Sequence, residues 1–115
     1  MTLNDFLKKL DDTPENICFN DTLAQIDALY DFTPTAFTNG AVRNEAGQNN
    51  GSCKLFSFAK LHGLSPQQTL ACFGDYYRKD VLGNPQGADH QNIRNFMKNG
   101  WEGIKFEGKA LKLKA

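Results

Sequence analysis

Apolar side chains recur every three or four residues in five stretches of the chain, the spacing that predicts amphipathic helices. The stretches span residues 3–10, 20–31, 52–62, 65–81 and 89–100. Thr2 is the expected N-cap of the first helix, with Asp5 three residues later, and Asn20 or Asp21 is the expected N-cap of the second.

The later helices carry their own start and stop signals. Ser65, Pro66 and Gln68 predict a capping box with proline at the first helical position. Asp89 is the expected cap of the last helix, and Gly100 its stop. The fourth stretch is the most clearly patterned helix of the chain, because its cap and its apolar stripe agree.

Two short segments predict β-hairpins. The pair Asn39-Gly40 favours a two-residue turn between residues 36–38 and 41–43. Near the C-terminus, residues 104–106 and 111–113 alternate apolar residues with lysine around Glu107-Gly108. Helices without strand-helix-strand alternation predict a mainly helical α+β fold, with about five helices and two short hairpins, as one domain over residues 1–115.

Composition adds constraints on partners and location. The 115 residues carry 13 basic and 13 acidic side chains, so no net field attracts nucleic acid or anionic lipid. The charge is unevenly distributed, because residues 1–50 sum to −5 and residues 51–115 to +5. The chain has neither an apolar run long enough to span a membrane nor a secretory signal, which predicts a cytoplasmic protein that binds neither nucleic acid nor membrane.

Lysines crowd the C-terminal strands: Lys105, Lys109, Lys112 and Lys114. Lysine on an exposed strand commonly prevents edge-to-edge aggregation, which accounts for these residues without a ligand.

Cysteine and histidine supply the candidates for catalysis. Cys53 lies in the first turn of its predicted helix, where the helix dipole favours a thiolate. His90 also lies at a helix start, which favours the neutral ring of a general base, and Asn92 or Asp89 is available to orient it. Cys53 is better explained as a buried residue, since free cysteine is among the most buried residue types. Isolated cysteines and histidines without paired spacing predict no metal site, and no motif indicates a cofactor.

A polar loop rich in Asn, Gln and Gly precedes the third helix. It has the composition of an anion-binding turn, but its spacing is not that of a P-loop. It is explained as well by ordinary surface structure. The residues predicted to bind a small carboxylate or phosphate are Asn44, Gln48, Asn49, Ser52, Lys54, Arg78 and Arg94.

Three blocks of the sequence resemble the HopJ type III effector family: DFTPTAFTNG at residues 31–40, NEAGQNNGSCKLFSFAKLHGLSPQQTLACFGDYYR at 44–78, and DHQNIRNFMKNGW at 89–101. The resemblance implies a small bacterial protein, grouped with effectors that plant pathogens inject into host cells, and it supplies no catalytic residues. The first helix stands where an injected effector usually has a pliable leader, so the alternatives of a resident cytosolic protein and a secreted effector stay open.

The sequence therefore favours a module that binds a small anionic ligand or a protein partner. Its site is expected where the loop at residues 44–52 and the helix start at residues 89–95 converge on one hollow. The alternatives are a cysteine-dependent hydrolase or transferase that uses Cys53 and His90, and a host-directed effector that acts by protein contact.

Overall fold

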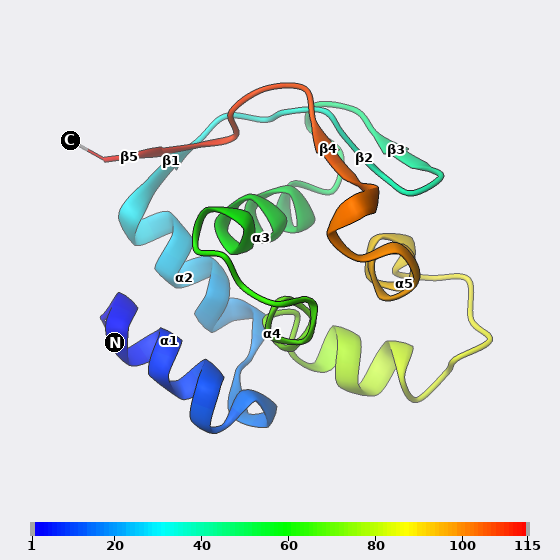
Figure 1. The fold of residues 1–115 in the computed structure, drawn as a ribbon, viewed down its shortest axis with the longest axis horizontal. Coiled ribbons are helices and arrows are strands. Elements are labelled where there is room, and N and C mark those ends of the chain that lie inside the picture. Colours follow the sequence, from blue (N-terminus) through cyan, green and yellow to red (C-terminus); the bar gives the residue numbers. More distant parts are fainter. Residues whose placement is uncertain (1, 115) are drawn as a thin grey trace.

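In the computed structural model, which describes residues 2–114, five α-helices and five short strands follow one another along the chain (Figure 1). The helices are α1 (Leu3–Asp12), α2 (Phe19–Leu29), α3 (Asn50–Leu61), α4 (Pro66–Ala71) and α5 (Gln91–Asn99). The strands are β1 (Tyr30–Phe32), β2 (Phe37–Asn39), β3 (Val42–Asn44), β4 (Ile104–Phe106) and β5 (Leu111–Leu113). Short 3₁₀-helices lie at η1 (Pro14–Asn16) and η3 (Gly100–Gly103), and a π-helical segment lies at η2 (Tyr76–Val81). The predicted mainly helical α+β fold is confirmed.

Both predicted helix starts with reciprocal caps are present. The Thr2 hydroxyl accepts a hydrogen bond from the Asp5 amide at 3.1 Å, and the Asp5 carboxylate accepts one from the Thr2 amide at 3.3 Å. At α4 the Ser65 hydroxyl accepts from the Gln68 amide at 3.1 Å, and the Gln68 side chain accepts from the Ser65 amide at 3.0 Å. Each box satisfies two backbone donors that the helix cannot bond itself.

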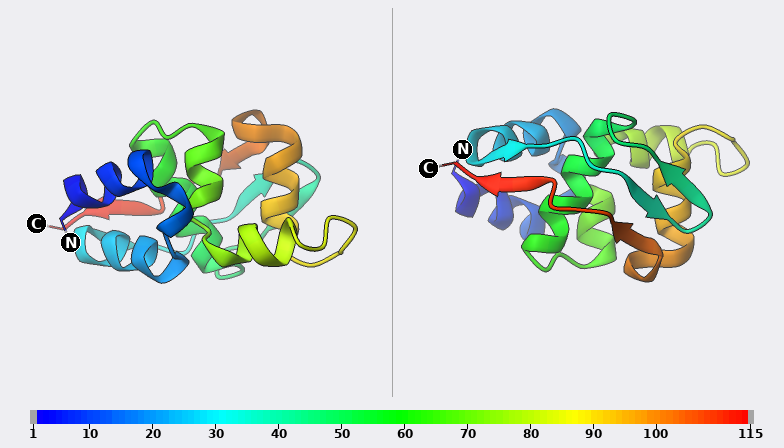
Figure 2. Two further views of the ribbon diagram at one scale, coloured as in Figure 1. Left: turned by 90° about the horizontal axis from the view of Figure 1, so that it is seen from below. Right: turned by 90° about the horizontal axis from the view of Figure 1, so that it is seen from above.

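Helix α3 lies at the centre of the molecule. The strands pass over one side of it, and the other helices surround the rest (Figures 1 and 2). Its Leu55, Phe56, Phe58 and Ala59 are fully buried, as a helix with a broad apolar surface requires. The ring of Phe56 lies 5.0 Å from that of Phe96 and 5.4 Å from that of Phe73, so α3 ties α5 and the segment after α4 into one core.

The two C-terminal strands belong to different sheets. Strand β4 pairs with β2, opposite Phe37 to Asn39, whereas β5 pairs with β1, opposite Tyr30 to Phe32. The prediction that residues 104–106 and 111–113 form a hairpin with each other is therefore wrong. The connection between them instead runs along residues 33–36, where Glu107 donates to the Ala36 carbonyl and Thr33 donates to the Ala110 carbonyl.

The first hairpin forms, but one residue later than predicted. Strands β2 and β3 are antiparallel with Asn39 opposite Val42, so Gly40 and Ala41 make the turn. Gly40 has φ 60°, which suits glycine at the first central position of a two-residue hairpin turn. Asn39 is thus a strand residue, fully buried, rather than a turn residue.

The fourth predicted helix is interrupted. Helix α4 ends at Ala71, and Gly74 adopts φ 63° before η2 continues the chain. A Cβ at Gly74 would lie 2.7 Å from the Phe19 amide nitrogen, so a side chain here would collide with the start of α2. The break lets the two backbones approach each other.

Two other helix starts differ from the predictions. The N-caps are Cys18 for α2 and His90 for α5, in place of Asn20 or Asp21 and of Asp89. Asn49 is the N-cap of α3. Within residues 2–114, the structure contains no helix with the length and hydropathy needed to cross a membrane.

Candidate functional site

A cavity of about 400 Å³ opens where the N-terminal ends of α3 and α5 meet. Asn49, Gly51 and Ser52 line it from α3 and its cap, and residues 90–93 line it from α5 and its cap. The structure thus brings together the two distant segments that the sequence predicted to share a hollow. The remaining walls are Phe19, Val42, Phe73 and Tyr76.

Both helices that border the cavity begin at an N-cap residue with an unusual backbone conformation. Asn49 and His90 have φ 51° and 50°, the left-handed region, and neither makes a side-chain capping bond. In a non-glycine residue this conformation costs on the order of 1 kcal/mol. The first intrahelical bonds run from the Cys53 amide to the Asn49 carbonyl and from the Arg94 amide to the His90 carbonyl. The preceding amides of each first turn have no carbonyl partner within their helix.

Buried asparagines lock these two helix starts to the hairpin. The side-chain nitrogen of Asn92 donates to the side-chain oxygen of Asn44 at 2.9 Å, and the side-chain nitrogen of Asn44 donates to the side-chain oxygen of Asn92 at 3.1 Å. The side-chain nitrogen of Asn49 donates to the same Asn44 oxygen at 2.7 Å. The side-chain nitrogen of Asn39 donates to the backbone carbonyl of Asn92, also at 2.7 Å. The network fixes the relative positions of α3, α5, β2 and β3 around the cavity.

This network changes the roles predicted for two residues. Asn44, predicted to bind a ligand, is 1% exposed and lies outside the cavity lining, so it positions Asn49 and Asn92. Asn92, predicted as a catalytic partner of His90, does line the cavity, but its side chain is bonded to Asn44 and Asn39. Sequence reasoning missed Asn39, because the Asn-Gly pair is itself a strong turn signal.

One wall of the cavity is aromatic. The ring of Phe19 lies parallel to that of Phe73, with centroids 6.1 Å apart, and meets the edge of Tyr76 at 5.2 Å. A Cβ at Gly51 would lie 2.9 Å from the Phe19 ring, so only glycine permits this approach. Phe19 was not predicted, since it precedes the residues expected to start its helix.

His90 stands at the edge of the cavity between acidic and aromatic neighbours. Its Nε2 lies 3.1 Å from Asp80 and 3.9 Å from Asp89, and its ring centre lies 5.3 Å from that of Tyr76. A proton on Nε2, donated to Asp80, leaves Nδ1 as a hydrogen-bond acceptor. The ring is therefore oriented by η2 as well as by its own helix.

Cys53 lies beneath the cavity, outside its lining. Its side chain is 1% exposed, and the thiol donates to the Thr35 carbonyl at 3.5 Å. Burial raises the pKa of this thiol, an effect that opposes the thiolate predicted from the helix dipole.

Two of the predicted cations lie away from the cavity. The Lys54 ammonium pairs with Asp27 at 3.0 Å and lies above the Phe32 ring. The Arg94 guanidinium pairs with Asp89 at 2.6 Å and donates to the Pro85 carbonyl at 3.2 Å. Gln48 accepts a bond from the Glu45 amide at 3.0 Å, within the loop itself. Of the predicted binding residues, Asn49 and Ser52 line the cavity.

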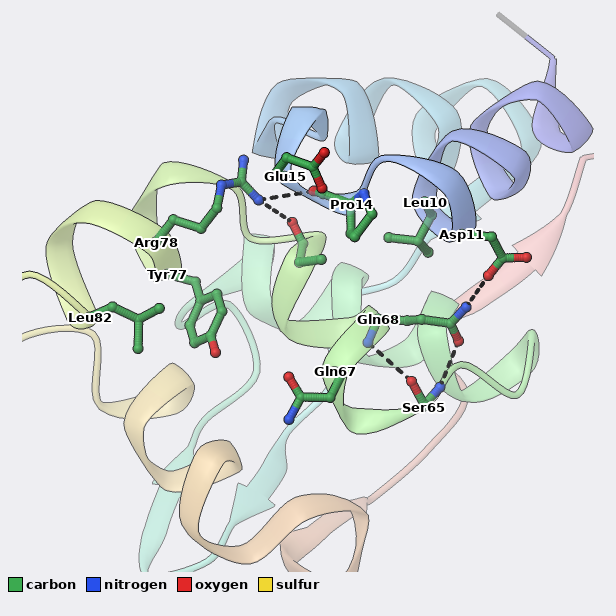
Figure 3. Close-up of a pocket in the computed structure, with 11 residues that line it drawn as sticks. Leu10, Asp11, Pro14, Glu15, Ser65, Gln67, Gln68, Tyr77, Arg78 and Leu82 are labelled. Carbon is green, nitrogen blue, oxygen red and sulfur yellow. Dashed lines mark hydrogen bonds between the residues drawn. The ribbon is translucent and has the colours of Figure 1, made fainter.

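Arg78 lies at a second hollow, between η1, α4 and η2. Figure 3 shows its guanidinium turned toward backbone carbonyls, those of Pro14 at 3.1 Å and Ala71 at 3.4 Å. It also donates to the Ile17 carbonyl. These bonds tie the turn after α1 to α4, so Arg78 has a structural role remote from the polar loop.

Comparisons with known proteins identify a family and a solved structure. Over 99% of its length, the chain is similar to a crystal structure of a protein of unknown function, VPA0580, with 57% identity, a TM-score of 0.97 and 95% of that chain covered. No curated protein matches the sequence. The family model for the HopJ type III effector protein matches residues 3–111, nearly the whole chain. The protein therefore belongs to the HopJ family.

Proposed function

We propose that this protein is a ligand-binding module and that the cavity between α3 and α5 holds a small aromatic carboxylate. The observation that carries the proposal is the convergence of two helix N-termini on one cavity with an aromatic wall. Backbone amides at such ends bind anions, and aromatic rings bind flat apolar groups.

The expected charge of the ligand follows from the electrostatics of the cavity. Each helix start contributes roughly half a positive charge, so the two together match about one negative charge. Lys54 and Arg94, the cations predicted to assist, are paired with carboxylates elsewhere. Asp80 and Asp89 add negative charge beside His90, which disfavours a dianion. A monocarboxylate therefore suits the site better than a phosphate.

The expected shape follows from the walls. Phe19 and Tyr76 present an edge-to-face pair, and Ile93 and Val42 add apolar surface from α5 and β3. A flat ring against this surface would place its carboxylate near the first turns of both helices. The buried asparagine network holds those turns in place before the ligand arrives, which lowers the ordering cost of binding.

The cysteine-dependent hydrolase or transferase has less support. A nucleophile must reach the substrate, and Cys53 is buried with its thiol bonded to a backbone carbonyl. The Cys53 thiol contacts the Thr35 carbonyl, whereas the His90 ring faces Asp80 and Tyr76. Ligand binding requires neither an accessible thiol nor a contact between Cys53 and His90.

Gln91→Glu tests the proposal sharply. Gln91 is exposed at the first residue of α5 and lines the cavity. A carboxylate there favours the helix by its dipole but repels a bound anion. We expect benzoate, at about ten times its dissociation constant, to stabilise the wild type by about 1.4 kcal/mol and to bind the variant about tenfold more weakly.

The matched control is Gln67→Glu. Gln67 is exposed in the first turn of α4 and lines the other hollow, so the change adds the same charge to a different helix start. We expect this variant to bind benzoate like the wild type. Equal loss in both variants, or no stabilisation of the wild type by benzoate or related aromatic acids, would reject the proposed ligand.

A further inference from the structure

A groove separate from the cavity runs between the end of α3 and the connection from β4 to β5. Its volume is about 540 Å³. Its accessible apolar surface comes from Leu61 and Phe106, with Leu111 buried in its floor. Leu61, the last residue of α3, is 55% exposed. The groove therefore offers a hydrophobic surface to a partner.

Lysines flank this apolar surface. Lys60 and Lys109 both line the groove, and the Lys60 ammonium lies 5.8 Å from the centre of the Phe106 ring. Among residues 2–114, neither lysine has a carboxylate within ion-pair distance. Glu107, the acidic residue next to the groove in sequence, is bound by the Arg43 guanidinium at 2.9 Å. The positive charge of the rim is therefore not neutralised locally.

We propose that this groove docks an acidic segment of a partner protein that carries a bulky apolar side chain. Unpaired lysines and an apolar floor lie side by side in the groove, so its charge and its surface both complement such a segment. A carboxylate on the partner can pair with Lys60 or Lys109, while a leucine or phenylalanine side chain covers Leu61 and Phe106. A small inorganic anion would leave the apolar surface exposed, and a purely apolar ligand would leave the lysines unpaired.

Two further lysines lie on the neighbouring strands, although outside the groove lining. Lys105 and Lys112 are exposed on β4 and β5, and within the described residues neither forms an ion pair. These lysines attract an acidic chain toward the groove and raise its association rate at low salt. Protection of strand edges explains lysine on the strands, but it does not explain Lys60, which lies on α3.

Fluorescence anisotropy with a labelled peptide of alternating glutamate and leucine tests the proposal. Three further probes distinguish the apolar contribution, the charge contribution and general attraction to an anionic surface. They are a peptide with serine in place of leucine, one with lysine in place of glutamate, and vesicles of phosphatidylserine. We expect the glutamate-leucine peptide to bind the wild type more tightly than either altered peptide, with affinity that falls as salt rises.

Variants locate the binding on the groove. The double variant Lys60→Glu with Lys109→Glu should weaken the peptide about tenfold, and Leu61→Ser about fivefold. Both changes are at exposed side chains, so the fold is retained. Lys8→Glu, on the exposed face of α1, is the matched control and should bind like the wild type.

Three outcomes would overturn the proposal: no binding of the glutamate-leucine peptide, equal weakening by Lys8→Glu, or binding to the vesicles alone. Because the groove and the cavity share no lining residue, failure here leaves the proposed carboxylate site untouched.

Discussion

The side-chain amides of Asn44 and Asn92 exchange two hydrogen bonds, at 2.9 and 3.1 Å, and so join strand β3 to the first turn of α5. Both residues are buried. This pair sets the distance between the two helix starts that form the cavity. Its integrity should therefore control both stability and binding.

Asn92→Ala removes this pair. The change leaves the buried side-chain amide of Asn44 without two of its hydrogen bonds, so we expect the free energy of unfolding to fall by about 1–3 kcal/mol. Urea denaturation measures the loss. Asn95→Ala, one turn later with its side chain bonded only within α5, should cost less than about 0.5 kcal/mol. Similar losses in the two variants would show that the asparagine network contributes little.

Two glycines with nearly equal φ angles allow the cost of backbone strain to be distinguished from the cost of a steric clash. Gly63 has φ 62° and open space around it, whereas Gly74 has φ 63° and lies against the backbone of Cys18 and Phe19. Gly63→Ala should cost about 1 kcal/mol, from strain alone. Gly74→Ala should cost about 1–3 kcal/mol more, because the methyl group forces the start of α2 away. Equal costs would mean that this close approach is relaxed easily.

The thiols should react at very different rates. Cys18 is exposed, while Cys53 and Cys72 are buried, and burial raises the pKa of Cys72 to about 12. We expect one thiol of the native protein to react rapidly with a disulfide reagent at neutral pH and the other two to react only after unfolding. Rapid reaction of Cys53 in a Cys18→Ser variant would restore it as a candidate nucleophile.

Stability should depend on pH through His62. Its Nε2 lies 3.0 Å from the Tyr30 hydroxyl, and burial lowers the pKa of the ring below the ordinary 6.5. The unfolded chain then binds a proton more readily than the folded chain, so stability is fully present above pH 6.5 and falls as pH drops toward the folded pKa. Urea denaturation across this range should show the loss in the wild type and a smaller one in His62→Gln. If the free energy of unfolding depended on pH in the same way in His62→Gln, a group other than His62 would be responsible.

Local signals were predicted from the sequence more reliably than pairing over long distances. The caps at Thr2 and Ser65 depend on residues three positions apart, and both formed as expected. The terminal hairpin failed because β4 and β5 each found a partner far back in the chain, which alternation alone cannot specify. The interruption at Gly74 depends on contact with α2 and has no local signal beyond the glycine itself.

The site was predicted in outline but not in detail. The polar loop and the His90 segment do converge, because both lie at helix starts that face the same hollow. Lys54 and Arg94 pair with carboxylates instead, and Arg78 donates to backbone carbonyls. Charge alone does not reveal which partner a long side chain will choose. The aromatic wall at Phe19 depends on the absence of a side chain at Gly51, a contact visible only in three dimensions.

We infer that the first turns of α3 and α5 together bind one carboxylate. Backbone amide chemical shifts, followed by NMR during a titration with benzoate, test it most directly. We expect the amides of residues 50–52 and 91–93 to shift together, with one dissociation constant, and Gln91→Glu to weaken the response of both sets. Shifts confined to one helix, or shifts that Gln91→Glu leaves unchanged, would contradict it.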